Sequence, residues 1–244
     1  MQNTVVITGA GISVESGIQP FRGKNGIWNE NPTEMATYRN FRTNTSGFLQ
    51  WYYHRFVSCK DALPNGAHEI LAKHNVKLIT QNIDNLHHKA GHATDALIEI
   101  HGNINFKRTI QAMERDELVL AHWDQVDEAH LERDLFDLFH IRKDGSIDEQ
   151  QSMRPHILLF DEYYTELYQY TKAQQWLEAA PTIIFIGTSN SVGFTYGALQ
   201  EALFAKKKII VVDPNPAPSF MQPSVEIIQS TATEFCNKYL MNYI

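Results

Sequence analysis

The sequence is poor in cysteine and lacks long apolar runs. Of its 244 residues only two are cysteines, Cys59 and Cys236, and neither belongs to a Cys-x-x-Cys pair. A disulfide framework and a cysteine zinc site are therefore not indicated. No apolar run approaches the length needed to cross a bilayer, and no segment resembles a signal peptide. We expect a protein without a membrane segment, in a reducing, cytoplasmic compartment.

Positive charge is also scarce. Asp and Glu number 28 against 21 Lys and Arg, which gives a formal net charge of -7. A non-specific nucleic-acid-binding protein needs a basic face, so nucleic acid is not expected as a partner. Hydrophobic residues make up 43% of the chain, which is ample for the core of a globular protein.

Short apolar runs rich in β-branched residues end repeatedly in small or polar residues. Runs of this kind are typical of strands buried on both faces. They occupy Thr4–Thr8, Lys77–Thr80, Ala96–His101, His156–Phe160, Thr182–Gly187 and Ile209–Asp213. Helical spacing lies between some of them, as in Ala67–His74 and Ala173–Ala180. The alternation predicts an α/β fold, with a parallel sheet covered by helices on both faces.

Two stretches interrupt this alternation. Residues 106–152 are charged and irregular, and residues 29–63 carry an aromatic stripe at helical spacing, formed by Phe48, Trp51, Tyr52 and Phe56. We interpret both stretches as insertions that build a second, smaller domain and leave a cleft between the domains. The larger domain would then comprise residues 1–28, 64–105 and 153–244.

The first predicted strand runs directly into Gly9-Ala10-Gly11. Glycine tolerates a positive φ and lets a ligand approach the backbone closely, and the N–H groups of a following helix suit a phosphate. Ser13 and Ser16 would add hydroxyl donors. The third glycine of the G-x-G-x-x-G dinucleotide motif is missing. Phosphate binding is the favoured interpretation of this turn, and a plain strand-to-helix connection is the alternative.

Further polar clusters follow other predicted strands. They are TQNIDNLHHKAG from Thr80, EIHGN from Glu99, and later RPHILLFDE, IGTSNSV and VVDPNP. The carboxyl ends of parallel strands lie at one edge of a sheet, where ligands bind in open α/β folds. The clusters therefore predict a single ligand site at that edge.

These motifs, in this order, resemble those of the sirtuins, the NAD-dependent protein-lysine deacylases. The family's G-A-G-x-S-x-x-S-G-I…F-R-G, Q-N-I-D, H-G-N, R-P-H…F-x-E and G-T-S motifs all occur, and the similarity covers nearly the whole chain outside residues 106–152. The resemblance implies a Rossmann-like domain with a smaller domain, NAD as co-substrate and an acyl-lysine peptide or protein as substrate. The implied products are nicotinamide, free lysine and O-acyl-ADP-ribose.

The resemblance also implies roles for residues of this chain. The cofactor-binding residues would be Gly9, Ala10, Gly11, Ser13, Ser16, Phe21, Arg22, Trp28, Gln81, Asn82, Ile83, Asp84, Gly187, Thr188, Ser189, Asn215 and Ala232. The substrate-binding residues would be Tyr52, Arg55, Phe160, Glu162 and Val192. The catalytic residues would be His101 and Asn82, with Asn82 orienting the ribose hydroxyls.

His101 is the candidate general base, because a histidine pKa of about 6.5 suits proton transfer at neutral pH. The alternative is a strand-end histidine that is merely satisfied by hydrogen bonds. We expect the remaining histidines of this region to be solvated helix or loop residues, namely His87, His88 and His92.

Tyr52 and Arg55 lie three residues apart on a predicted helix and therefore on one face. Sirtuins of the desuccinylase type carry a Tyr-x-x-Arg here, followed by a Pro-Asn and a His, and Pro64-Asn65 and His68 follow at a similar distance. The resemblance implies that the pair binds the carboxylate of a succinyl or malonyl group. The alternatives are that Tyr52 is a plain core residue and that Tyr53 supplies the hydroxyl.

The chain departs from most sirtuins in its small domain. Most sirtuins bind a structural zinc there with four cysteines, and residues 106–152 contain none. The spacings of His122, His130 and His140 match no usual metal site, so no metal is expected. Packing would have to hold this domain together, through Leu135, Phe136, Leu138 and Phe139.

A second departure lies on the substrate side. Asp161 stands where the family has the glycine of Phe-Gly-Glu, a segment that pairs with the substrate peptide as an added strand. We expect this aspartate to crowd or recharge the peptide groove.

The NAD-binding residues do not distinguish deacylation from other NAD-consuming reactions. Attack by water would make the protein an NAD glycohydrolase, and attack by a protein side chain would make it an ADP-ribosyltransferase. A further alternative is a non-catalytic NAD or ADP-ribose sensor. A hydride-transferring dehydrogenase is disfavoured by the missing third glycine.

Overall fold

Two sheets organise the fold of this computed structural model, which describes residues 3–19 and 32–244. Within those residues, six parallel strands form one sheet in the order β3-β2-β1-β7-β8-β9. The strand order reverses between β1 and β7, which is where open α/β sheets bind ligands. The strand bounds are β1 Thr4–Thr8, β2 Lys77–Thr80, β3 Leu97–Glu99, β7 Thr182–Ile186, β8 Lys208–Val212 and β9 Val225–Ile228.

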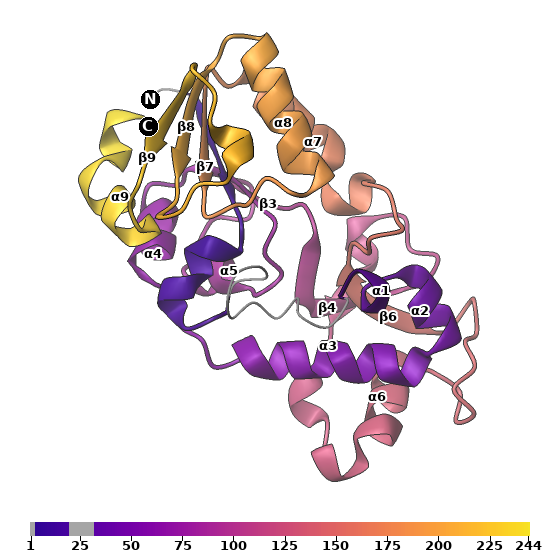
Figure 1. The fold of residues 1–244 in the computed structure, drawn as a ribbon. Helices are drawn as coiled ribbons and strands as arrows, with labels where there is room; N and C mark the ends of the chain where they lie inside the picture. Colours follow the sequence, from indigo (N-terminus) through magenta and orange to yellow (C-terminus); the bar gives the residue numbers. More distant parts are fainter. Residues whose placement is uncertain (1–2, 20–31) are drawn as a thin grey trace.

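Helices cover both faces of this sheet, because successive strand residues point to opposite sides. Val5 and Ile7 of β1 face the cluster that includes α7 (Tyr170–Ala179) and α8 (Gly193–Phe204), and Val6 faces the cluster that includes α4 (Gly66–Lys73) and α9 (Ala232–Lys238). Figure 1 shows the two helix pairs on opposite sides of the strands. The predicted Rossmann-like parallel sheet is confirmed.

A smaller antiparallel sheet contains one strand that was predicted for the parallel sheet. His156–Phe160 was expected in the parallel sheet, but the strand is β6, Met153–Ile157, and it pairs with β4, Gly102–Thr109. β4 also pairs with β5, Val119–Leu120. A short apolar run predicts a strand but not the sheet to which the strand belongs. β4 was not predicted because its sequence is rich in polar residues, although its first three residues are buried.

The smaller body adds helices from both insertions to this sheet. They are α1 Pro32–Met35, α2 Tyr38–Thr43, α3 Thr45–Cys59 and α6 Leu131–Phe139, whereas α5 Leu86–Lys89 belongs to the larger body. Figure 1 shows α3 running along the smaller body with α6 against it. Their core includes Phe48 of α3 and Trp123, together with Leu135, Phe136 and Phe139 of α6 and the partly buried Leu138. The expected packing of these last four residues is confirmed.

The described residues show neither a membrane-spanning helix nor a cluster of metal ligands. Residues 3–19 and 32–244 contain no helix with the length and apolar character that a bilayer crossing requires. In the same part of the chain, no group of three or more His, Cys, Asp or Glu side chains is placed to hold a metal ion. His130 instead lies at the surface, 3.1 Å from the carboxylate of Asp127.

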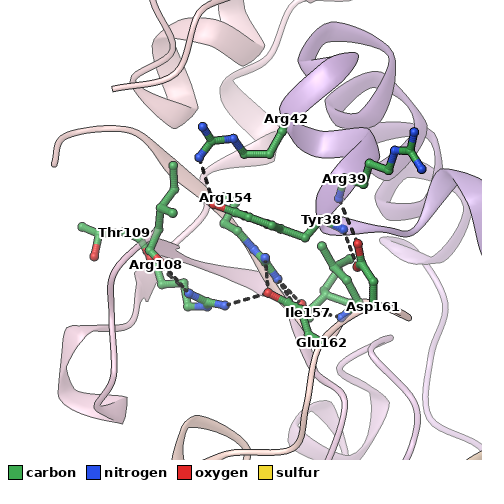
Figure 2. Close-up of polar contacts among 11 residues, drawn as sticks. Tyr38, Arg39, Arg42, Arg108, Thr109, Arg154, Ile157, Asp161 and Glu162 are labelled. Carbon is green, nitrogen blue, oxygen red and sulfur yellow. Dashed lines mark hydrogen bonds and ion pairs between the residues drawn. The ribbon is translucent and has the colours of Figure 1, made fainter. Parts of the chain in front are cut away.

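A buried ion cluster joins the small sheet to the loop after β6. Arg154 is 1% exposed, and its two terminal nitrogens donate to the carboxylate of Glu162 at 2.6 and 2.8 Å. Arg108 of β4 lies 3.8 Å from the same carboxylate. Figure 2 shows both guanidiniums converging on Glu162. The carboxylate also accepts from the Leu159 N–H at 3.0 Å, so the cluster fixes this loop on the small sheet.

Asp161 binds the start of α2, whereas the adjacent Glu162 binds the small sheet. Its two carboxylate oxygens accept from the backbone N–H groups of Tyr38 and Arg39, at 2.6 and 3.0 Å (Figure 2). The N–H of Phe160 donates to the carbonyl of Ala36 nearby, at 3.0 Å. The side chain of Asp161 therefore holds the start of α2 on the loop after β6, and its expected effect on a peptide groove stays a prediction.

Several histidines are buried beneath the parallel sheet. His87 and His92 are 2% and 3% exposed, so the expectation that they are solvated was wrong. The reason is that α5 packs on α4 rather than on the surface, which places the rings of His68 and His87 4.7 Å apart. His87 Nε2 lies 3.2 Å from the hydroxyl of Thr8. His88 is partly exposed and lies 3.2 Å from the Glu99 carboxylate.

Replacing Arg154 tests the ion cluster. Arg154→Gln removes a buried cation and leaves the partly exposed Glu162 without its bidentate partner, so we expect the free energy of unfolding to fall by about 3 kcal/mol. Arg142→Gln is the matched control, because it breaks an exposed pair with Asp148 and should cost less than about 1 kcal/mol. Urea unfolding measures both. Equal losses in the two variants would show that the cluster adds no more than a surface pair.

The buried histidines predict loss of stability in acid. Burial lowers the pKa of His68 to about 4, and burial followed by repulsion from Arg108 lowers that of His156 to about 3. Both rings are neutral when folded, so below about pH 6.5 only the unfolded chain takes up their protons. Stability is therefore full above that pH and falls by about 1.4 kcal/mol per pH unit and per histidine below it.

Urea unfolding at pH 7.5, 6 and 5 measures this slope. His68→Gln should flatten it, whereas a change at the exposed His54 should not. A free energy of unfolding that stays constant from pH 7.5 to 5 would contradict the prediction.

Candidate active site

A cavity of about 800 Å³ lies at the carboxyl ends of the parallel strands, between the two bodies. Its volume is within the range of small-molecule sites, which is about 300–1,000 Å³. A smaller pocket of about 30 Å³ adjoins it, and both are lined by Ala10, Arg55, Asn82 and Ile83. The larger body supplies one wall and α3, with the loop after β6, supplies the other.

The glycine turn after β1 packs against the turn after β7. A Cβ on Gly9 would lie 2.8 Å from the carbonyl oxygen of Gly187, and one on Gly11 would lie 2.6 Å from its Cα. Gly9 itself has an ordinary φ of -124°, whereas Gly187 has a φ of +59°. The glycines at 9 and 11 are therefore required by the neighbouring backbone and not by a positive φ of Gly9. The helix that follows is a short 3-10 helix, Ala10–Ser16, rather than a full α-helix.

Three predicted residues form a hydrogen-bond chain at the mouth of the small pocket. The amide of Asn82 donates to the hydroxyl of Ser13 at 3.0 Å, and that hydroxyl donates to Asp84 at 2.7 Å. The other Asp84 oxygen accepts from the Leu86 N–H at 3.0 Å. Burial raises the pKa of Asp84, and the two donors oppose the rise. The chain leaves the carbonyl oxygen of Asn82 and further lone pairs of Asp84 as acceptors for a ligand.

Gln81 connects three strands at the base of the cavity. Its side-chain nitrogen donates to the hydroxyl of Thr188 at 3.1 Å and to the carbonyl of Thr8 at 3.4 Å. Its backbone carbonyl faces His101 Nδ1 at 3.0 Å. Gln81 therefore braces the ends of β1 and β7 and also holds the candidate base.

His101 lies where the chain passes from the parallel sheet to the small one. The next residue, Gly102, has a φ of +83°, and a Cβ there would lie 2.1 Å from the carbonyl oxygen of His156. Only glycine fits this crossing, which turns the His101 side chain into the cavity. Burial lowers the pKa of His101 to about 4, while the Gln81 carbonyl opposes this. The ring is therefore neutral at pH 7 and able to accept a proton.

Most of the other predicted site residues line the same cavity. They are Gly9, Ala10, Gly11, Gln81, Asn82, Ile83, Gly187, Thr188, Ser189, Asn215 and Ala232, with Tyr52, Arg55, Phe160, Glu162 and Val192 on the substrate side. Ser16 is not among the described lining residues, and its hydroxyl accepts from the Asn65 amide at 3.0 Å. Phe21, Arg22 and Trp28 lie outside the described residues.

The residues of the expected acyl selector are close to each other in this wall. Tyr52 is 2% exposed, and burial raises its pKa, so it keeps its proton as a donor. The Arg55 guanidinium lies over the Trp51 ring, 4.9 Å from its centroid. Burial lowers the pKa of Arg55, which still stays charged at neutral pH. The alternative hydroxyl, Tyr53, lies 3.4 Å from Glu128 instead.

The two residues that follow the selector motif have structural contacts. Asn65 caps α4, and the ring of His68 accepts from the Asn65 backbone N–H at 3.4 Å, which completes a capping box. The Asn65 amide also donates to the carbonyl of Ile12 at 2.8 Å. Asn65 and His68 therefore fix the start of α4 against the glycine turn.

Several lining residues were not predicted from the sequence, among them Val14, Glu15, Trp51, Tyr164, Asp213 and Thr231. Asp213 could have been found, because it ends a predicted strand. Tyr164 could not, because no sequence pattern separates it from Tyr163, which is 88% exposed.

Comparison with known proteins identifies relatives of this site and fold. A family model described as the Sir2 family matches residues 9–193. An NAD-dependent protein deacylase of Pasteurella multocida is 33% identical, covering 98% of this chain and 97% of that protein. One of Helicobacter pylori is 31% identical, covering 95% and 93%. A solved Sir2 homolog–NAD complex is 26% identical, with a TM-score of 0.76 over 98% of this chain and 88% of that one.

The family match covers more than half of the chain, and the relatives match it almost from end to end. The order of the motifs and the placement of their residues around one cavity agree with that match. The chain therefore belongs to the Sir2 family.

Proposed function

We propose that this protein is an NAD-dependent protein-lysine deacylase, with His101 as its general base. The observation that carries the proposal is that His101, Asn82 and the glycine turn line one cavity, and that the Asn82–Ser13–Asp84 chain leads from Asn82 to the adjoining small pocket. Relatives of similar length are named NAD-dependent protein deacylases. The cavity has room for both a dinucleotide and the side chain of an acyl-lysine.

The lining residues fit NAD in one orientation. The adenosine half would lie along Gly187, Thr188 and Ser189, with Asn215 and Ala232 at its far end. The nicotinamide would enter the small pocket, which Ile83 and Asp84 line. An ionised carboxylate only accepts hydrogen bonds, so Asp84 suits the N–H₂ of the carboxamide.

The chain's own residues would then divide the chemistry between them. Bound NAD supplies a ribose whose bond to nicotinamide breaks as the acyl-lysine carbonyl oxygen attacks C1′. Asn82 would orient the ribose hydroxyls through its carbonyl oxygen. His101 would take the proton of the ribose hydroxyl that attacks the acyl carbon. Its Nδ1 is fixed as the protonated nitrogen by the Gln81 carbonyl, so Nε2 is the basic one.

The substrate side of the cavity supports a preference for acidic acyl groups. Phe160 and Val192 line the part of the cavity where we place the peptide. Tyr52 and Arg55 line the same cavity, as a hydroxyl donor and a guanidinium. Together they suit the distal carboxylate of a succinyl or malonyl group. Glu162 is committed to Arg154 and would shape this wall without binding the substrate.

A cytoplasmic location is part of the proposal. Both cysteines of the chain are buried and free, and burial raises the pKa of each thiol, to about 11 for Cys59 and about 12 for Cys236. Unpaired cysteines are usual in reducing compartments.

Replacing the base tests the proposed reaction. Wild-type protein should release nicotinamide from NAD only when an acyl-lysine peptide is present, with an O-acyl-ADP-ribose product identified by mass spectrometry. His101→Ala should lower the rate of that product at least about a hundredfold. His54→Ala, at an exposed histidine, is the matched control and should keep the wild-type rate.

Two outcomes would count against a deacylase. Peptide-independent nicotinamide release with free ADP-ribose would identify an NAD glycohydrolase. NAD binding in calorimetry without turnover on any acyl peptide would identify a sensor.

Replacing the guanidinium tests the acyl preference. Arg55→Gln removes the charge that would pair with the succinyl carboxylate, so the ratio of kcat/KM for succinyl over acetyl peptide should fall by about tenfold or more. Arg39→Gln, at an exposed arginine of the same insertion, should leave the ratio unchanged. The selector is excluded if wild-type protein already prefers acetyl, or if Arg55→Gln keeps the wild-type ratio.

A further inference from the structure

The basic nitrogen of His101 already has a hydrogen-bond partner. His101 Nε2 lies 3.0 Å from the hydroxyl oxygen of Tyr164. Nδ1 must carry the ring proton, because its partner is the Gln81 carbonyl, which only accepts. Nε2 therefore holds the lone pair, and the Tyr164 hydroxyl donates to it. A ribose hydroxyl could reach this lone pair directly only if Tyr164 moved away.

Tyr164 is held in place by rings on several sides. Its ring stacks on Tyr170 at 5.4 Å with an interplanar angle of 19°, and it lies 5.8 Å from Phe194 and 6.0 Å from His101. Swinging the phenol out of the site would break all of these contacts. The packing therefore favours a tyrosine that stays between the cavity and His101 over one that leaves when NAD binds.

Tyr164 also borders the cavity in which the ribose would lie. Its hydroxyl oxygen is both a donor to His101 and a possible acceptor, because a hydroxyl carries two lone pairs. We propose that Tyr164 is a catalytic residue that relays the ribose proton to His101. The proposal rests on the proposed function, since it specifies how the base of that reaction receives its proton.

The relayed step balances as two coupled proton transfers. The ribose O–H bond breaks as its proton joins the Tyr164 oxygen, and the original Tyr164 proton moves to His101 Nε2. The tyrosine ends neutral, the histidine ends as an imidazolium, and the ribose oxygen is free to attack the acyl carbon. No electron is gained or lost, and no further reactant is needed.

The surroundings of the hydroxyl suit a concerted transfer. Burial raises the pKa of Tyr164 to about 12, and the backbone N–H of Phe194 opposes the rise as a hydrogen-bond donor. A free phenolate is thus unfavourable at neutral pH, while the Phe194 N–H stabilises negative charge on the oxygen during the transfer. Besides His101, which is bonded to the hydroxyl, Tyr170 also acts on Tyr164 and raises the same pKa.

The first test needs no turnover. The hydroxyl donates to the neutral form of His101 and so lowers its pKa. Tyr164→Phe should therefore raise the His101 pKa, measured by NMR titration of the imidazole in the free protein. Tyr170→Phe removes a hydroxyl from the same aromatic stack and should leave it unchanged. An unshifted His101 pKa in Tyr164→Phe would show that the hydroxyl does not bind Nε2, which overturns the relay.

The second test follows the chemistry in single turnovers. With an acyl-lysine peptide and NAD, Tyr164→Phe should form O-acyl-ADP-ribose about ten- to a hundredfold more slowly than wild type, with NAD affinity within about threefold. Rates in H₂O–D₂O mixtures should show two protons in flight for wild type and one for Tyr164→Phe. Tyr164 replaced by 3-fluorotyrosine keeps the shape and the two-proton signature but changes the rate.

The outcomes separate the relay from the proposed function. If wild-type protein turns over, Tyr164→Phe keeps the wild-type rate and both show one proton in flight, the relay is overturned and the deacylase proposal is kept. Absence of peptide-dependent turnover in wild type overturns both. A slow Tyr164→Phe variant that also loses NAD affinity by more than about tenfold would make Tyr164 a binding residue and overturn the relay.

Discussion

The close approach of two backbone turns at the strand-order reversal is the constraint on which the site depends. Gly11 N–H donates to the Gly187 carbonyl at 2.8 Å, and Gly187 N–H donates to the Val212 carbonyl at 3.0 Å. These bonds tie the ends of β1, β7 and β8 so tightly that no Cβ fits at Gly9 or Gly11. The backbone of the turn is therefore fixed, and it positions Ser13 in the Asn82–Ser13–Asp84 chain.

The opposite wall is fixed by charge and by aromatic packing. Arg154 and Arg108 converge on the Glu162 carboxylate, while Asp161 holds the first turn of α2. The loop after β6 thus binds the two arginines of the small sheet through Glu162 and the start of α2 through Asp161. Beneath α3 lies a core that includes Trp123, whose indole N–H donates to the Ile104 carbonyl at 2.7 Å. The smaller body keeps its shape through these contacts.

The parallel sheet could be predicted from local patterns, whereas most of the cavity lining was implied by the order of the motifs and the resemblance that they carry. Buried parallel strands are continuous apolar runs, and their polar ends must gather at one edge. The course of β4 escaped prediction because its buried positions include Asn103 and Arg108. The burial of His87 and the bond between Tyr164 and His101 depend on how distant segments pack, which no spacing encodes.

The crossing at Gly102 ties the chemistry to the geometry of the whole molecule. The imidazole of His101 stands on the covalent joint between the sheets, and its own carbonyl accepts from the Leu158 N–H at 3.0 Å. Any shear of one body against the other must carry that ring along with it. A polypeptide bound between the two bodies would therefore shift the His101 ring through this joint, without touching the ring itself.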